Sequence, residues 1–146
     1  MCIRDRHYDT ARTGQNTTET VLTPSNVNST SFGKLFSLTV DGYVYAQPLY
    51  VPAVAIPGNG THNVLYVATE HDSLYAFDAD TGSQLWHVTF LLNGATTLTP
   101  SNVGGTQDIN PEIGITGTPT IDPTTNTLYV VVNTEMCIRD RLWSGR

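Results

Sequence analysis

The chain has 146 residues, with 13 acidic side chains against 7 Lys and Arg, and a formal net charge of −6 at pH 7. Nucleic acids and anionic membrane surfaces bind clustered Lys and Arg, so this acidic composition argues against either as a partner. No apolar run approaches the ~20 residues that a membrane-spanning helix needs, so the sequence predicts no membrane span.

The two ends of the chain share one hexapeptide, Met-Cys-Ile-Arg-Asp-Arg, at residues 1–6 and 136–141. The two copies contain both cysteines, both methionines and four of the six arginines. Their sequence resembles the translation of a transposase sequencing adapter, and such segments are excluded before the fold is considered. We therefore predict an adapter-like artefact at 1–6, a protein segment at 7–135, and a second artefact with an unplaced tail at 136–146.

Within 7–135, short β-branched and aromatic runs alternate with turn residues, and helix signals are almost absent, which is typical of an all-β protein. A polar connection between Leu91 and Ile115 has no clear periodicity, and a loop of that length usually has a function or packs as an excursion. The predicted strands, in chain order, are Gly33–Val40, Val44–Val51, Asn63–Thr69, Ser73–Asp78, Gln84–Phe90, Gly117–Ile121 and Thr127–Asn133.

The predicted strands repeat along the chain, and the segment Pro52–His62 forms an insert between two of them. One outer strand comes first, then four strands, then two more. Sheets of four antiparallel strands that recur around an axis are the blades of a β-propeller, and each blade is stable only when stacked on its neighbours. We therefore predict a partial β-propeller: one complete four-stranded blade plus parts of two neighbouring blades, which are its partners. The matching runs are Lys34–Ser37 with Gln84–His87, Leu65–Val67 with Leu128–Val130, and Gln47–Val51 with Thr118–Asp122.

The run from Leu74 to Trp86 carries the most specific motif. Residues alternate between the two faces of the strand Ser73–Asp78, because successive side chains of a strand point to opposite sides. Asp78 is expected to accept hydrogen bonds from backbone amides two residues on, and Gly82 to supply a positive φ at the end of the turn. Trp86 then lies on the outer strand, where its flat ring can pack against the next sheet.

This run resembles the repeat of pyrroloquinoline-quinone (PQQ) propellers, Ala-x-Asp-x-x-Thr-Gly-x-x-x-Trp. The opening of the chain is also similar to that of quinoprotein alcohol dehydrogenases, and the two resemblances together cover most of residues 8–135. Phe36 stands where Trp86 stands one repeat later, which departs from the pattern. The matched positions of the repeat are Ala76, Asp78, Thr81, Gly82 and Trp86, and those of the opening are Tyr8-Asp9-x-Ala11-Arg12-x-Gly14, Leu22–Val27 and Gly33–Phe36.

The resemblance implies an exported protein, extracellular or periplasmic, and leaves its function open. The first hypothesis is a quinoprotein-like propeller that acts as a scaffold or binding module. The alternative is the N-terminal part of a quinone- and calcium-dependent dehydrogenase that oxidises an alcohol or sugar. Such dehydrogenases often carry a disulfide of adjacent cysteines near the cofactor, and residues 7–135 contain no cysteine, which favours the first. A third hypothesis, an adhesin-like β-sandwich, is disfavoured by the blade motif.

The cofactor and site residues follow from these hypotheses. No cofactor can be assigned to this segment, and PQQ and calcium belong to the dehydrogenase alternative. The residues that would hold them are spread over many blades in that family, so catalytic and cofactor-binding residues stay unassigned, and whether the protein is an enzyme stays open.

Several acidic and histidine side chains have two interpretations. Glu70-His71-Asp72 suggests a metal cluster or a charged hairpin turn, and we favour the turn because only one His is present and neighbouring residues alternate faces. Asp78 and Asp80 suggest calcium ligands or turn residues, and we favour turn residues because a calcium loop needs more oxygens. No metal site is therefore predicted.

Three other side chains are considered as candidates for a site. Glu112 lies in the long loop before a strand, and one interpretation places it at the central channel, where such propellers hold cofactors. His62 and His87 have no Ser or Asp nearby in the sequence that would suggest a catalytic triad.

Overall fold

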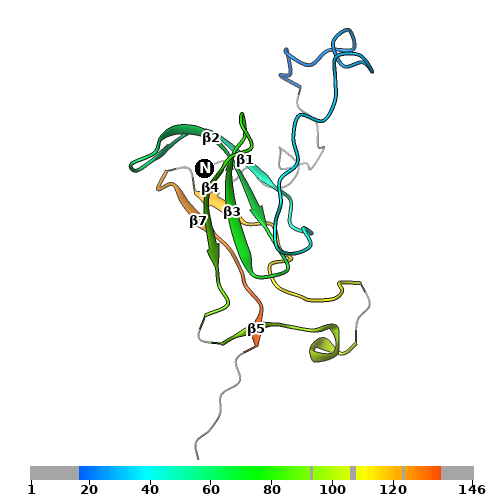
Figure 1. Cartoon of the computed structure of the whole chain (residues 1–146), viewed down its shortest axis with the longest axis vertical. Coiled ribbons are helices and arrows are strands. Elements are labelled where there is room, and N and C mark those ends of the chain that lie inside the picture. Colours follow the sequence, from blue (N-terminus) through cyan, green and yellow to red (C-terminus); the bar gives the residue numbers. More distant parts are fainter. Residues whose placement is uncertain (1–16, 93, 106–107, 123, 136–146) are drawn as a thin grey trace, which may run out of the picture.

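The computed structural model describes residues 17–92, 94–105, 108–122 and 124–135 (Figure 1). These residues are all-β apart from one short 3-10 helix, as predicted, and none of their helices is long and apolar enough to cross a membrane. The adapter-like hexapeptides, the tail and the Tyr8–Gly14 match lie outside them. The elements are β1 (Leu49–Ile56), β2 (Gly60–Ala68), β3 (Ser73–Asp78), β4 (Gln84–Thr89), β5 (Thr96–Thr97), η1 (Pro100–Val103), β6 (Thr120–Asp122), β7 (Thr127–Tyr129) and β8 (Thr134–Glu135).

The strands β1 to β4 form one antiparallel sheet in which each strand pairs with the next along the chain. The prediction of four successive antiparallel strands is confirmed, and β3 begins and ends at the predicted residues. Its register places Ala76 opposite Trp86 on the edge strand β4. The smaller sheets pair β6 with β7 and β5 with β8.

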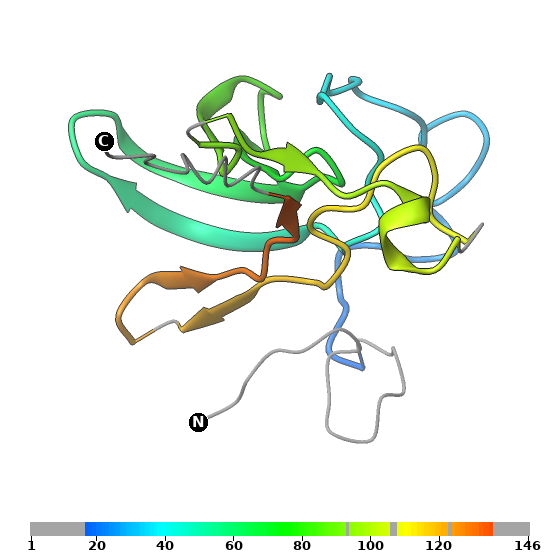
Figure 2. The ribbon, with the colours of Figure 1, turned by 90° about the horizontal axis from the view of Figure 1, so that it is seen from below.

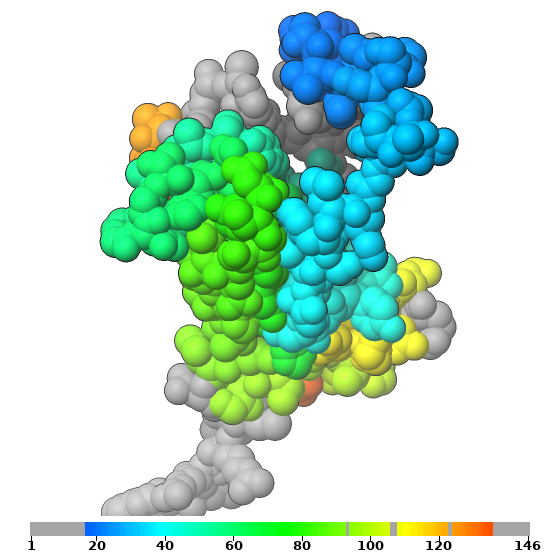
Figure 3. Space-filling view, turned by 45° about the horizontal axis from the view of Figure 1, so that its top comes forward, coloured from blue at the N-terminus to red at the C-terminus, as the bar shows by residue number. Residues whose placement is uncertain are grey.

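The predicted strand Gly33–Val40 is wrong. This segment is extended but forms no strand, and it runs beside the sheet without a ladder partner (cyan in Figures 1 and 3). Its composition favours a strand, but β-propensity depends strongly on context and reflects side-chain packing rather than an intrinsic backbone preference. Leu38 and Val40 nevertheless pack on the sheet through their side chains.

The next predicted strand is shifted. Strand β1 begins at Leu49 rather than Val44, because Pro48 has no N–H to donate and the Gln47 N–H is taken by Thr118 Oγ1 at 3.1 Å. It then continues through Pro52 to Ile56, so most of the predicted insert is strand. A β-bulge between Val51 and Val54, with Ala53 at φ 54°, accommodates the proline.

The remaining boundaries differ by a few residues. Strand β2 begins three residues before the predicted start, β4 ends one residue early, and both strands after the long connection are shorter than predicted. The connection itself contains the short strand β5, the helix η1 and a bridge between Leu98 and Ile113. Long loops with such contacts pack as excursions on the fold.

Both faces of the central strand β3 are covered, whereas the edge strands β1 and β4 are partly exposed. All six residues of β3 are buried, and the predicted alternation is confirmed, since Leu74 packs on one face while Tyr75 and Phe77 pack on the other. The first face contacts Ala46, Ile115, Leu128, Val130 and Val132, and the second contacts Leu38 and Val40. The sheet therefore lies between the chain segments that precede and follow it (Figure 2).

The β6–β7 hairpin has the same pairing register as the β1–β2 hairpin. Tyr50 faces Leu65 in the first, and Ile121 faces Leu128 in the second. Because Tyr50 and Ile121 are matched by the internal repeat, as are Leu65 and Leu128, similar sequence is accompanied by similar pairing.

Candidate functional site: the two polar ends of the sheet

The β2–β3 turn contains the Glu70-His71-Asp72 triplet. The structure confirms that it is a hairpin turn. It is not the solvated turn that its charge suggests, because Glu70 and Asp72 are each 0% exposed. Carboxylates are almost never fully buried unless other groups pair with them, so the partners of this turn define the site.

One side of the turn is held by the segment before β1. Asp41 accepts hydrogen bonds from Thr69 Oγ1 at 2.9 Å and from Ser73 Oγ at 2.6 Å. Gly42 is packed so closely that a Cβ there would lie 2.8 Å from the backbone nitrogen of His71. A side chain at position 42 would therefore push the turn away.

The other side is held by the segment before β6. Glu70 Oε2 accepts a hydrogen bond from the Gly114 N–H at 2.8 Å and another from Thr116 Oγ1 at 3.0 Å. A Cβ at Gly114 would lie 2.2 Å from the carbonyl oxygen of Glu70. The two backbones thus meet at a distance that only glycine allows.

His71 and Glu112 form an ion pair across the same contact. His71 Nδ1 lies 2.9 Å from Glu112 Oε2, which also accepts a hydrogen bond from Thr97 Oγ1. A carboxylate only accepts, so Nδ1 carries the proton. This hydrogen bond raises the pKa of His71 above its ordinary value. The structure therefore places Glu112 against the turn, and its suggested place at a central channel stays a prediction.

Asp72 has the least complete set of partners. Its Oδ1 accepts only a long hydrogen bond, 3.4 Å, from the Asn133 N–H. Its Oδ2 and the Oε1 of Glu70 are buried and make no hydrogen bond within the described residues. Burial, together with the charge of Glu70, raises the pKa of Asp72 to about 6. A buried polar atom without a partner costs roughly 1–3 kcal/mol of stability. Other contacts of the turn must offset this cost.

In the described part of the chain, no three His, Cys, Asp or Glu side chains are placed to hold a metal ion. His87 Nε2 lies 3.9 Å from Asp41 Oδ2, a carboxylate distant in the sequence. Ser73 donates to Asp41 rather than to His87, and a triad needs the serine on the histidine.

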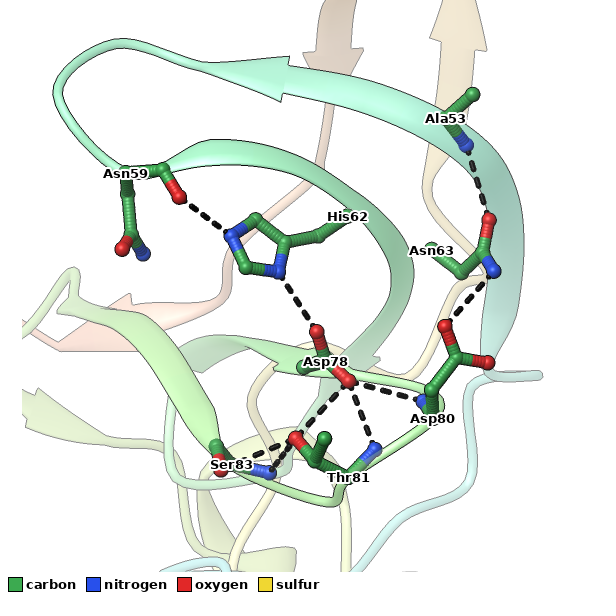
Figure 4. A network of polar contacts seen from close by, with 8 residues as sticks. All are labelled: Ala53, Asn59, His62, Asn63, Asp78, Asp80, Thr81 and Ser83. Atoms are coloured by element: carbon green, nitrogen blue, oxygen red, sulfur yellow. Dashed lines mark hydrogen bonds and ion pairs between the residues drawn. The ribbon is translucent and has the colours of Figure 1, made fainter.

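The opposite end of the sheet contains the turn of the blade motif (Figure 4). Asp78 Oδ1 accepts hydrogen bonds from the Thr81 N–H at 2.7 Å, from Thr81 Oγ1 at 2.9 Å and from the Asp80 N–H at 3.0 Å. Gly82 has φ 75°. The predicted turn chemistry of Asp78 is confirmed. Asp80 also holds the turn to strand β2, because its Oδ2 accepts a hydrogen bond from Asn63 Nδ2 at 2.9 Å.

His62 joins this turn to the β1–β2 hairpin, and its pairing with Asp78 was not predicted from the sequence. Its Nδ1 lies 2.6 Å from Asp78 Oδ2, and its Nε2 lies 2.6 Å from the carbonyl oxygen of Asn59. Both neighbours only accept, so both ring nitrogens must donate and the ring is an imidazolium. The hydrogen bond raises the pKa of His62 and lowers the pKa of Asp78 to about 2. The alternation along β2 was the available signal, since it puts His62 beside the end of β3.

Comparison of the chain with protein-family models, with curated proteins and with solved structures found no match. The fold and the two polar ends therefore define an all-β protein built on a four-stranded antiparallel sheet.

Proposed function

We propose that the chain is a segment of an exported, quinoprotein-like β-propeller that acts as a scaffold or binding module. The observation that carries the proposal is the burial of β3 on both faces, by residues that precede the sheet and by residues that follow it. A two-sheet sandwich leaves one face of each sheet to solvent, whereas stacked blades bury both.

Contacts between equivalent positions of the repeat support the same arrangement. The Gln47 N–H donates to Thr118 Oγ1, and these two residues are the equivalent first positions of the matched runs Gln47–Val51 and Thr118–Asp122. Phe36, which is equivalent to Trp86, has its ring 3.0 Å from where a Cβ on Gly82 would lie. An aromatic ring of one repeat thus packs on the turn glycine of the next.

The stacking can be tested with Phe36→Trp, which restores the residue that the repeat pattern has at this position. If repeats stack through this ring, the larger flat surface should raise the midpoint of thermal unfolding and give a fluorescence maximum at shorter wavelength than a solvated Trp. Phe32→Trp is the matched control, because Phe32 is 58% exposed. Equal effects of the two substitutions would contradict the stacking.

The function can be tested by adding PQQ and calcium chloride to the protein and passing it through a desalting column. A scaffold or binding module should retain no quinone absorbance and reduce no dye with alcohols or sugars as donors. Retained quinone together with calcium-dependent dye reduction would overturn the proposal in favour of the dehydrogenase.

A further inference from the structure

The β2–β3 turn contains two buried carboxylates whose hydrogen bonding is incomplete. Glu70 and Asp72 are two residues apart, both are fully buried, and each has one oxygen without a hydrogen-bond partner. The other oxygen of each is directed to the segments that cover the turn, to Gly114 from Glu70 and to Asn133 from Asp72. These covering segments also bind each other, since Asn133 Nδ2 donates to the carbonyl oxygen of Gly114 at 2.7 Å.

Two negative charges that are buried two residues apart in the chain would require a compensating positive charge. The titratable groups that face Asp72 are Glu70, His71 and Glu112, and Asp41 acts on His71. Among these His71 alone is basic, and its Nδ1 proton is already given to Glu112. A proton on Asp72 lowers the cost of this burial, because it removes one of the buried charges.

We propose that the buried Asp72 is held in its neutral, protonated form, and that this neutral form keeps residues 112–116 and Asn133 packed on the β2–β3 turn. A proton on Asp72 Oδ2 leaves Oδ1 free to accept from the Asn133 N–H. When the pH rises the proton passes to water, Asp72 becomes a buried anion, and the contact between the turn and its covering segments loosens. We call this proton-dependent contact between the β2–β3 turn and its covering segments the clasp. It does not depend on the proposed function.

The direction of the pH effect follows from the raised pKa of Asp72. The pKa of Asp72 is raised from 3.8 to about 6 in the folded chain. A raised pKa stabilises the fold fully below the unfolded value, and the stabilisation is lost as the pH rises through the folded value. His71, whose pKa is also raised, acts in the same direction. The clasp should therefore be closed at about pH 5 and loosened at about pH 8.

The test is a pH titration of the full chain, followed by the NMR signals of the backbone amides of Gly114 and Asn133. We expect both amides to shift in one step near pH 6, and the step to disappear in Asp72→Asn, whose amide keeps a donor at all pH values. Asp122→Asn is the matched control, because Asp122 also accepts from a nearby backbone amide but is only half-buried, at the end of β6. A step that persists in Asp72→Asn would overturn the proposal.

Two further measurements keep the proposal falsifiable if Asp72→Asn fails to fold. The carboxyl carbon of Asp72 in the unsubstituted chain should titrate near pH 6, and titration near the ordinary value of 3.8 would refute the protonated Asp72. Calcium chloride at about pH 8 should leave the thermal midpoint unchanged. If calcium instead raises it, and Glu70→Gln abolishes that effect, a metal cation rather than a proton holds the clasp.

Discussion

The two ends of the four-stranded sheet differ in how their buried carboxylates are hydrogen-bonded. At the Asp78 end, one carboxylate accepts hydrogen bonds from the turn that follows it and pairs with His62. At the Glu70 end, two carboxylates are buried, and each has an oxygen without a partner. The first end is satisfied by residues close in sequence or on the neighbouring strand, and the second depends on segments that come together only in the complete fold.

The two ends therefore favour different protonation states of their carboxyl groups. Charge-assisted hydrogen bonds to a carboxylate are the stronger kind, and those at Asp78 hold its charged form with a pKa of about 2. The Glu70 end instead favours protonation of Asp72. Raising the pH therefore removes the proton of Asp72 at the Glu70 end and that of His62 at the Asp78 end, whereas the Asp78 carboxylate itself is protonated only when the pH falls toward about 2.

The largest effect is expected from Gly114→Ala, which attacks the Glu70 end. The added Cβ would lie 2.2 Å from the Glu70 carbonyl oxygen, so one of the two backbones must move. Overpacking of this kind costs about 1–3 kcal/mol of unfolding free energy, which urea denaturation measures. Gly117→Ala is the matched control, because nothing lies within 4 Å of a Cβ there. If both variants lose the same stability, the close contact at Gly114 does not exist.

The same comparison explains what the sequence could predict. The hydrogen bonds of Asp78 reach two and three residues ahead, so local turn chemistry was sufficient. The hydrogen bond from Gly114 to Glu70 spans 44 residues, and no local pattern reports such a contact. Strand β3 was predicted at the correct residues, and its side chains point alternately to two buried faces. Residues 33–40 have strand composition but no partner, and pairing is a property of the whole fold.

A smaller effect is expected at the Asp78 end, where two substitutions separate the turn from the ion pair. Asp78→Asn keeps an oxygen for the Thr81 amide but loses the negative charge opposite His62. Asp78→Ala loses both. Thermal unfolding at about pH 6 should therefore rank the unsubstituted chain first, Asp78→Asn second and Asp78→Ala last. Equal midpoints for the two variants would show that the ion pair contributes nothing beyond the turn.

The smallest effect is expected from His62→Gln, and it should depend on pH. The pKa of His62 is raised above 6.5 in the folded chain, so its stabilising effect is complete below that value and is lost as the pH rises through the folded pKa. The difference in unfolding free energy between the unsubstituted chain and His62→Gln should therefore be greatest near pH 5 and shrink toward pH 9.

The double variant His62→Gln/Asp78→Asn provides the control for this dependence. If His62 acts through its hydrogen bond to Asp78, adding His62→Gln to Asp78→Asn should cost less stability than His62→Gln alone, because the ion pair is already lost. Full additivity of the two substitutions would mean that the imidazolium acts elsewhere, and its remaining contact with the Asn59 carbonyl would then have to carry the effect. The Asp78 end would in that case be held by its turn alone, and its contrast with the Glu70 end would rest on local hydrogen bonds.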